Sequence, residues 1–475
     1  MPLTVFNTLS QRKEPFVPLS GNRVGIYICG PTVYDYSHIG HARTFVSFDV
    51  IVKHLRRKSF DVLHVVNITN VDDKIIRRAN ETGRNPMELA DEFEHIFYED
   101  MDKLKVSKAD VNPRVSDHMP EIIAVIQSLI SKDFAYEVDG DVYFDVRKAN
   151  GYGHLSGQTL EEIKAGARVE VDERKRYQAD FALWKKAKPR EPFWESPWGK
   201  GRPGWHIECT AMSMKYIGPQ VDVHGGARDL IFPHHENEIV QSEAATGKKP
   251  FVKYWMHAGF LMVEGEKMAK SLGNFIVIRD LLKNYDPETF RLFVLSTHYR
   301  SPIDFSYSSL KQAESALGRL HDSLARVEEV IVSQPVIDPT AEEEAFDARV
   351  HAARNAFLEA MDDDFNTPIA ISHLFDFVRE VNRFIADHPK VSYSTLKKIR
   401  DAFLDIGGML GILKEPRMRE EPLPQEVSSL LEERQRLREL RDWKKADEIR
   451  TKILSLGYVL EDTREGVKVR KAVKR

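Results

Sequence analysis

The segment of this sequence that most constrains its fold runs from residue 23 to residue 67. Its pattern predicts four elements in succession: a buried strand at 23–28, a loop at 29–37, a helix at 38–57 and a second strand at 61–67. A strand, a glycine-containing loop, a helix and a strand form a right-handed βαβ unit, which implies a parallel sheet. Such sheets bind ligands at the carboxyl ends of their strands, where Cys29, His38 and Thr69 fall.

The remaining sequence predicts an interrupted sheet followed by helices. Residues 120–200 break the alternation with a helix, a hairpin and a stretch rich in Trp and Pro, so they predict an insertion. Sheet-type sequence resumes at 221–224 and 252–262. After about residue 308, apolar residues recur every three or four positions and predict a bundle of about four helices, with an acidic turn at 362–368. The length of 475 residues exceeds what one hydrophobic core accommodates, so several domains are expected.

Composition excludes several classes of function. The formal net charge of −4 argues against a protein that coats nucleic acid non-specifically, but it leaves a local RNA-binding patch open. The sequence has no run of about 18 apolar residues and no signal-peptide pattern, so we expect no membrane span and a cytoplasmic location. The two cysteines, Cys29 and Cys209, are too few for a disulfide framework, and small buried apolar residues are one interpretation of them.

Two short motifs point to a nucleotide. Residues 38–41 read His-Ile-Gly-His at a helix start, where N–H groups favour phosphate and Gly40 lets a base or ribose approach the backbone. Residues 267–271 read Lys-Met-Ala-Lys-Ser between glycine-containing flanks, which suits a loop that closes on a polyphosphate. Each motif alone is weak, because paired histidines or lysines are commonly solvated surface residues. The two motifs together, in this order, are a much stronger signal.

A third group of residues suggests a metal site. His234 and Glu238 are four residues apart, so both project from one helix face. With Cys29 and Cys209 they supply two thiolates, an imidazole and a carboxylate, which form a suitable tetrahedral zinc set. Spacing alone also allows two alternatives: unconnected residues, or a ligand from His235 or Glu236.

The two nucleotide motifs resemble the signatures of class I aminoacyl-tRNA synthetases, with Ala269 in place of the commoner serine. Over nearly its whole length the chain is similar to the cysteinyl-tRNA synthetase family. The matching stretches are residues 29–35, 67–74, 201–212, 229–238 and 446–463. The resemblance implies an α/β fold: a Rossmann-type parallel-sheet catalytic domain with an insertion, then a C-terminal helical bundle and a small anticodon-binding domain.

The resemblance also implies roles for individual residues. One zinc ion is held by residues matching Cys29, Cys209, His234 and Glu238, and the substrate thiolate approaches the metal. The implied ATP-binding residues are His38, Gly40, His41, Asp229 and Lys270, with Mg²⁺ bridging the phosphates. The implied catalytic residues are His38, His41, Lys267 and Lys270, and the implied cysteine pocket includes Thr69 and Trp205.

The zinc site agrees with the chemistry of selecting cysteine. A free thiol has a pKa near 8.5, and coordination to zinc deprotonates it, whereas the hydroxyl of serine is a poor zinc ligand. Steric contacts alone discriminate near-isosteres by only about 1–3 kcal/mol. A zinc site therefore makes a hydrolytic editing domain unnecessary, and the insertion at 120–200 is short for one.

The resemblance implies a cysteine–tRNA ligase that forms cysteinyl-adenylate from L-cysteine and ATP and transfers the cysteinyl group to the 3′ end of tRNA(Cys), acting as a monomer. Valine at position 469 departs from an aromatic residue that is frequent in the family. Two alternatives remain: a ligase that joins cysteine to an amino sugar on inositol, and a noncatalytic relative that binds tRNA or senses cysteine.

We expect six segments: two catalytic halves at 1–119 and 201–262, a connective insertion at 120–200, an ATP loop and connecting fold at 263–308, a helical bundle at 309–415 and an anticodon-binding domain at 416–475.

Overall fold

The computed structural model describes residues 2–159, 162, 173–268, 273–333, 338–413, 424–440, 442–456, 458–463 and 466–471. The chain divides into two compact units, Met1–Pro416 and Arg417–Arg475. None of the described helices combines the length and the apolar character that a membrane crossing requires.

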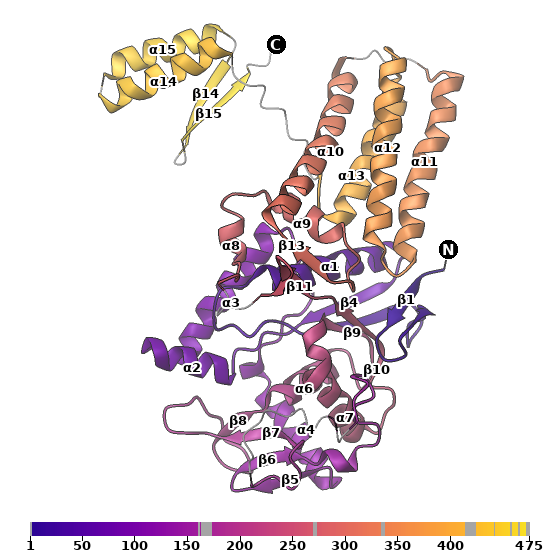
Figure 1. Ribbon diagram of the computed structural model, residues 1–475, viewed down its shortest axis with the longest axis vertical. Helices are drawn as coiled ribbons and strands as arrows, with labels where there is room; N and C mark the ends of the chain where they lie inside the picture. The colour runs from indigo at the N-terminus through magenta and orange to yellow at the C-terminus, as the bar shows by residue number, and fades with distance from the viewer. Residues whose placement is uncertain are drawn as a thin grey trace. The chain divides into compact units, whose positions relative to one another are not determined.

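A four-stranded parallel sheet lies at the centre of the first unit (Figure 1), in the order β10–β9–β3–β4. The strands in that order are Val252–Ala258, Val221–Ala227, Arg23–Ile28 and Asp61–Val66. Helix α1 (Ile39–Arg57) connects β3 to β4. The predicted βαβ unit and its parallel sheet are therefore confirmed.

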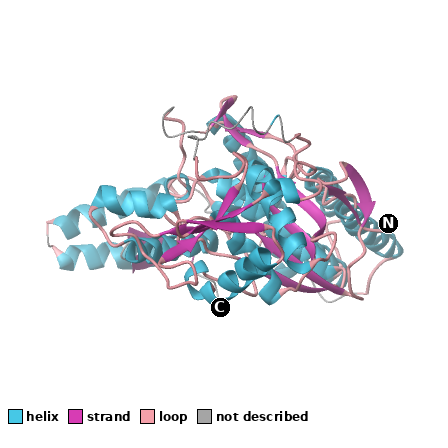
Figure 2. Cartoon of the chain, turned by 90° about the horizontal axis from the view of Figure 1, so that it is seen from below, coloured by secondary structure: helices cyan, strands magenta, loops and turns pink. Residues whose placement is uncertain are grey.

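The sheet is buried on both faces, with helices on either side of the strands in Figure 2. Successive residues of a strand point to opposite faces. Ile26 and Ile28 of β3 belong to one core with Phe48 of α1, whereas Tyr27 and Cys29 belong to a second core. That second core includes residues of α4 (Met119–Ser131), α6 (Trp205–Tyr216) and α7 (Glu236–Thr246). Burial on both faces explains why the strands are nearly continuous apolar runs.

The insertion forms a small antiparallel sheet of its own. Its four strands, in the order β5–β6–β7–β8, are Ala135–Val138, Asp141–Phe144, Phe181–Lys186 and Gly201–Pro203. Strands β5 and β6 are the predicted hairpin, with Asp139 and Gly140 both at positive φ in the turn. Strand β8 leads directly into α6, which returns the chain to the parallel sheet.

The predicted strand at 252–262 is divided in two. Strand β10 ends at Ala258, and β11 (Leu261–Val263) pairs instead with β13 (Ile303–Phe305) and β12 (Glu266–Lys267). The N–H of Gly259 donates to the carbonyl of Tyr299 at 2.8 Å, which turns the chain away from the parallel sheet. A Cβ on Gly259 would lie 2.4 Å from the carbonyl oxygen of Ser301, so only glycine fits at this crossing.

Four helices form the predicted bundle (Figure 1): α10 (Tyr307–Ser333), α11 (Ala341–Asp362), α12 (Thr367–Asp387) and α13 (Tyr393–Leu410). The predicted apolar stripe is fully buried at Leu310, Leu317, Leu320, Leu324 and Val327. Their cluster is continuous with the core between α1 and the sheet. The bundle and the sheet therefore share one hydrophobic core.

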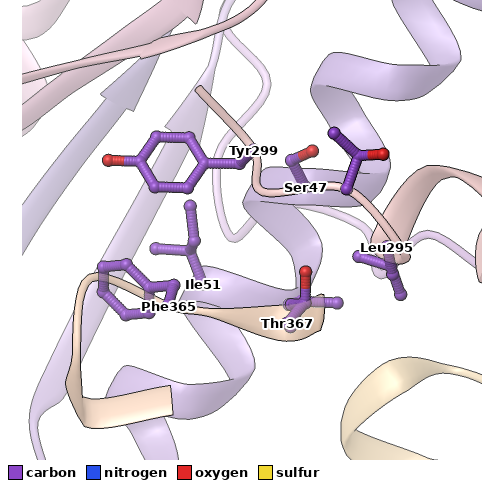
Figure 3. Close-up of a pocket in the computed structure, with 8 residues that line it drawn as sticks. Ser47, Ile51, Leu295, Tyr299, Phe365 and Thr367 are labelled. Atoms are coloured by element: carbon purple, nitrogen blue, oxygen red, sulfur yellow. The ribbon is translucent and has the colours of Figure 1, made fainter. Parts of the chain in front are cut away.

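The acidic turn between α11 and α12 joins the bundle to the sheet region. Asp364 accepts a hydrogen bond from the hydroxyl of Tyr299 at 3.0 Å and pairs with Arg300 at 2.6 Å. Asp362 pairs with His54 of α1 at 2.9 Å. Beneath the turn lies a cavity of about 10 Å³ (Figure 3), close to the lower limit for one water molecule. The helix that carries the first nucleotide motif is thus packed tightly against the bundle.

The other elements of the first unit are β1 (Thr4–Asn7), β2 (Arg12–Pro15), α2 (Asp73–Thr82), α3 (Pro86–Lys103), α8 (Ile278–Leu281) and α9 (Pro287–Leu295). The second unit contains α14 (Gln425–Glu439), α15 (Trp443–Ser455) and a hairpin of β14 (Tyr458–Thr463) and β15 (Gly466–Lys471). Its core includes Val427, Leu430, Ile453 and Leu460. The predicted charged helix near 425–440 is α14 and is confirmed.

Candidate active site

Four buried side chains converge at the carboxyl end of the parallel sheet. Cys29 follows β3, Cys209 lies in α6, His234 lies in the helical turn that leads into α7, and Glu238 lies in α7. The Cys29 and Cys209 sulfurs are 3.9 Å apart, and Cys209 Sγ is 3.5 Å from His234 Nε2. Glu238 Oε1 lies 2.9 Å from His234 Nε2 and 3.8 Å from Cys29 Sγ. This cluster, which we call the thiol site, is able to hold a metal ion.

A second set of donors overlaps the thiol site. It shares Cys29 and Glu238 and adds His224, at 2.8 Å from Glu238 Oε2, and His235, at 3.2 Å from Cys29 Sγ. The spacing in the sequence allowed His235 as an alternative ligand, and in the structure His235 lies beside the thiol site. His235 Nδ1 lies 2.8 Å from His257 Nε2, so a row of imidazoles extends away from the sulfurs.

The charges in the thiol site depend strongly on one another. Burial raises the pKa of the Cys29 thiol well above its usual value. The hydrogen bond with Cys29 lowers the pKa of Cys209 to about 6, against the effect of burial. Burial opposes ionisation of Glu238, but the charges of His224 and His234 lower its pKa to about 2. The cluster therefore offers an ionised carboxylate and a readily ionised thiol, which are the forms that bind cations.

Further side chains hold the ligands in position. His206 Nδ1 lies 2.9 Å from His234 Nδ1, so the Nε2 atom of His234 faces Cys209 and Glu238. The backbone N–H of Gly30 donates to Asn67 Oδ1 at 2.9 Å, and Asn67 Nδ2 donates to Thr69 at 3.2 Å. Sequence reasoning did not single out His206 or Asn67. The unusual density of histidines between positions 206 and 257 is the signal that could have revealed His206.

The two predicted pocket residues lie beside the thiol site. Thr69 is buried, and its segment pairs with Thr32 in a parallel bridge at the end of β4. Trp205 is half-buried at the start of α6, and its ring stacks on His234 with centroids 4.2 Å apart. An aromatic ring therefore covers one face of the thiol site.

The first nucleotide motif caps α1. The side chain of His38 accepts a hydrogen bond from the Gly40 N–H at 3.1 Å, and the His38 N–H donates to His41 Nδ1 at 3.4 Å. This capping box places the two imidazoles in a stack, with centroids 3.7 Å apart. Burial, and then the charge of Lys74, lower the pKa of His41 to about 4, so its imidazole is neutral near pH 7.

The second motif approaches the first. A Cβ on Gly40 would lie 3.4 Å from the methyl group of Met268, and the Ile39 N–H donates to the carbonyl of Ile276 at 3.0 Å. Lys267 is exposed in β12, with its ammonium 5.5 Å from the ring centroid of Phe260. Lys270 lies outside the described residues. Asp229 is exposed just after β9, at the same edge of the sheet as Cys29.

Comparisons with known proteins identify the family to which the chain is similar. A model of the tRNA synthetases class I (C) catalytic domain matches residues 15–315. A DALR domain model matches residues 356–414, and a model of the cysteinyl-tRNA ligase anticodon binding domain matches residues 420–470. Among solved structures, methionyl-tRNA synthetase of Mycobacterium tuberculosis with methionyl-adenylate superposes with a TM-score of 0.58 and 16% identity, covering 84% of this chain and 92% of that one. That likeness supports the class I fold.

Curated relatives extend over almost the entire chain. The cysteine–tRNA ligase of Thermococcus gammatolerans is 51% identical over 470 residues, which cover 98% of each chain. The cysteine–tRNA ligase of Trichlorobacter lovleyi is 48% identical over 482 residues, covering 98% of this chain and 99% of that one. Since the catalytic-domain model spans more than half of the sequence and these relatives span nearly all of it, the chain belongs to the cysteine–tRNA ligase family of ATP-dependent class I aminoacyl-tRNA synthetases.

Proposed function

We propose that this chain activates L-cysteine with ATP to form cysteinyl-adenylate and pyrophosphate, and then transfers the cysteinyl group to the 3′ end of tRNA(Cys). The observation that carries the proposal is the convergence of two thiols, an imidazole and a carboxylate beneath Trp205, at the edge of the sheet that also presents the first nucleotide motif. The proposal takes the protein to act as a monomer in the cytoplasm.

Zinc fits the thiol site better than it fits the overlapping set. Ligand atoms around tetrahedral zinc, with bonds of about 2.0–2.3 Å, lie about 3.3–3.8 Å from one another. Three separations in the thiol site, at 3.9, 3.5 and 3.8 Å, are close to that range, and the fourth, 2.9 Å between His234 Nε2 and Glu238 Oε1, is a hydrogen-bond distance. The separations that belong only to the second set, 3.2 and 2.8 Å, are hydrogen-bond distances. We therefore assign zinc to Cys29, Cys209, His234 and Glu238, with His224 and His235 as neighbours that orient these ligands.

In this assignment, bound zinc supplies a soft ligand position that favours the thiolate of cysteine over the hydroxyl of serine. The protein's part is to hold the substrate in place. The ring of Trp205 closes one side of the pocket, and Thr69, fixed through Asn67, forms another. The substrate carboxylate then points away from the sulfurs, toward the nucleotide.

Charge stabilisation is the main task at the nucleotide end, because attack on the α-phosphate moves negative charge onto pyrophosphate. His38 and His41 are positioned by helix capping to donate to phosphate oxygens. Gly40 leaves room for the base or ribose, Asp229 meets the nucleotide side, and Lys267 and Lys270 close over the pyrophosphate, which carries Mg²⁺. Neutral His41 is able to gain positive character as phosphate approaches.

The second unit is proposed to read the anticodon end of the tRNA. Its match to an anticodon-binding domain model supports this role and disfavours the amino-sugar ligase, which has no such end. The presence of both nucleotide motifs disfavours a noncatalytic relative. The six-segment division, with a helical bundle at 309–415 and an anticodon-binding domain at 416–475, is part of this proposal.

The direct test is ATP–pyrophosphate exchange that depends on cysteine, together with elemental analysis for one zinc per chain. We expect exchange with cysteine and negligible exchange with serine. Deletion of residues 417–475 should leave adenylate formation intact and weaken tRNA binding, because contacts with a distant arm supply affinity. Exchange that does not depend on cysteine would contradict the activation step. Unchanged tRNA charging after the deletion would contradict the role of the second unit.

A further inference from the structure

A cleft of about 740 Å³ opens beside the thiol site, between α2 and the insertion. Trp205 and His206 lie among its lining residues, so the cleft reaches the ring that covers the thiol site. Basic side chains line both walls: Lys74 and Arg77 from α2, and Lys175 and Lys185 from the insertion. The cleft is also lined by the carboxylates of Asp72, Asp73, Glu162 and Asp180, so the charges of the lining balance and a polyanion has to replace one of these carboxylates to pair with a cation.

One carboxylate, Asp73, joins the two walls across this cleft. It is the first residue of α2, and it pairs with Lys185 of β7 at 2.6 Å and with Arg202 of β8. Arg202 is buried and also pairs with Glu191 at 3.3 Å, so it is held from two sides. Asp73 and Lys185 remain 50% and 36% exposed, so solvent and ligands reach this pair.

The other carboxylates of the lining are engaged in local structure, and Glu162 accepts a hydrogen bond from the Thr159 N–H at 2.8 Å. Asp72 accepts a hydrogen bond from the Lys74 N–H at 2.7 Å and thereby caps α2. Asp180 accepts from the hydroxyl of Tyr136 at 2.7 Å and from the backbone of Val146 at 3.1 Å. Asp73 differs because its charge is directed at two cations of the opposite wall. The charge of Lys185, with that of Arg202, outweighs burial and lowers the pKa of Asp73 to about 2, so the carboxylate is ionised.

We propose that Asp73 is a placeholder for RNA: a phosphate of the single-stranded 3′ end of the tRNA replaces Asp73 as the partner of Lys185. Both anions carry one negative charge, so the ammonium stays paired before and after the exchange. Arg202 keeps its pairing with Glu191 and with Asp73, and the insertion therefore remains attached to α2. The proposal rests on the proposed tRNA ligase function, because it assigns part of the path of that tRNA.

The decisive experiment measures the binding of a tRNA(Cys) transcript to full-length Asp73→Asn. Removing the charge frees Lys185 from its competitor, so we expect binding to tighten by about two- to fivefold, the range of an exposed ion pair. The matched control is Asp133→Asn, which removes a pair with Lys148 inside the insertion and should not alter binding. If Asp73 served only to hold α2 against the insertion, Asp73→Asn would weaken tRNA binding, because the two walls of the cleft would separate.

Two further arms locate the effect. In the background of Lys185→Gln, the Asp73→Asn change should no longer tighten binding, and Lys185→Gln alone should weaken it with a shallower salt dependence. With a transcript that lacks the single-stranded 3′ nucleotides, Asp73→Asn should have no effect. Weaker or unchanged binding of the complete transcript to Asp73→Asn overturns the proposal. Cysteine-dependent exchange by the unmodified protein tests the ligase function separately.

Discussion

The thiol site and the nucleotide site lie at the same edge of one sheet, but their side chains are held in different ways. In the thiol site the donors are buried. The imidazole of His206 fixes the orientation of His234, and the imidazole of His224 fixes that of Glu238. In the nucleotide site His38 and His41 are half-buried, and Lys267 is exposed on a two-residue strand.

This difference matches two chemical tasks. Choosing between a thiol and a hydroxyl requires ligand atoms that are in place before the substrate arrives, because a loosely placed ligand would accept either group. Stabilising a transferring phosphate requires donors that close as charge moves, so exposed side chains on a hairpin are suitable. The comparison predicts that substitutions in the thiol site abolish binding of the metal, whereas those in the nucleotide site slow the reaction.

The largest effect is expected for Cys209→Ser. This change removes a ligand that belongs to the thiol site and not to the overlapping set. Zinc should be lost from the purified protein, and cysteine-dependent exchange should fall by about 10³-fold or more, because a site built around one specific contact depends on it that strongly.

The matched variant for that experiment is His235→Gln, since His235 belongs only to the overlapping set. It should retain one zinc ion per chain in elemental analysis. The reverse pattern, with zinc retained by Cys209→Ser and lost by His235→Gln, would move the metal to the second set.

At the nucleotide site, Lys270→Ala should lower the rate of adenylate formation by about 10²- to 10³-fold, the usual loss when one donor aimed at transition-state charge is removed. Zinc content and cysteine affinity should change little, because Lys270 acts on the phosphates. The control is Lys283→Ala, which removes an exposed lysine that pairs locally with Asp280. Pre-steady-state formation of adenylate at the wild-type rate would exclude Lys270 from the reaction.

An intermediate effect is expected for His224→Phe. The phenyl ring preserves the stack on Trp255, where the centroids are 4.7 Å apart, but it cannot bond to Glu238. Loss of such an orienting partner weakens metal affinity by about 10- to 100-fold. Competition with a chelator measures this directly. An unchanged zinc affinity would mean that the neighbours of Glu238 other than His224 hold its carboxylate in place.

The smallest effect is expected for Gly40→Ala, which is compared with Gly30→Ala. A Cβ on Gly30 would lie 1.5 Å from the backbone oxygen of Asn67, so Gly30→Ala should cost about 3 kcal/mol or more of stability by forcing the backbone apart. The atoms nearest to a Cβ on Gly40 are those of the His38 ring, at 2.9 Å, and the end of the Met268 side chain, at 3.4 Å, so Gly40→Ala should cost about 1 kcal/mol. Denaturant unfolding compares the two. If the two substitutions lowered stability equally, the thiol site would not be more rigid than the nucleotide site.

Much of the fold was predictable because its signals are local. The apolar runs of β3 and β4, the capping histidine before α1 and the leucine stripe of α10 each depend on residues close in sequence. The division of the predicted strand at 252–262 was not predictable, because it depends on a crossing between Gly259 and Ser301. The anchoring role of the acidic turn was missed for the same reason, since Asp364 meets Tyr299 and Arg300 only in the folded chain.

The sequence by itself determined the donor types: two cysteines, a His–Glu pair at helical spacing, and two nucleotide motifs in a fixed order. Those features are readable because a helix brings residues i and i+4 together whatever surrounds it. Only the tertiary structure decided that the donors after β3, in α6, and in and just before α7 meet, that His206 and His224 support them, and that Asp73 reaches across to Lys185. Contacts between distant segments depend on how the sheet, the insertion and the helices pack, and no local pattern encodes that packing.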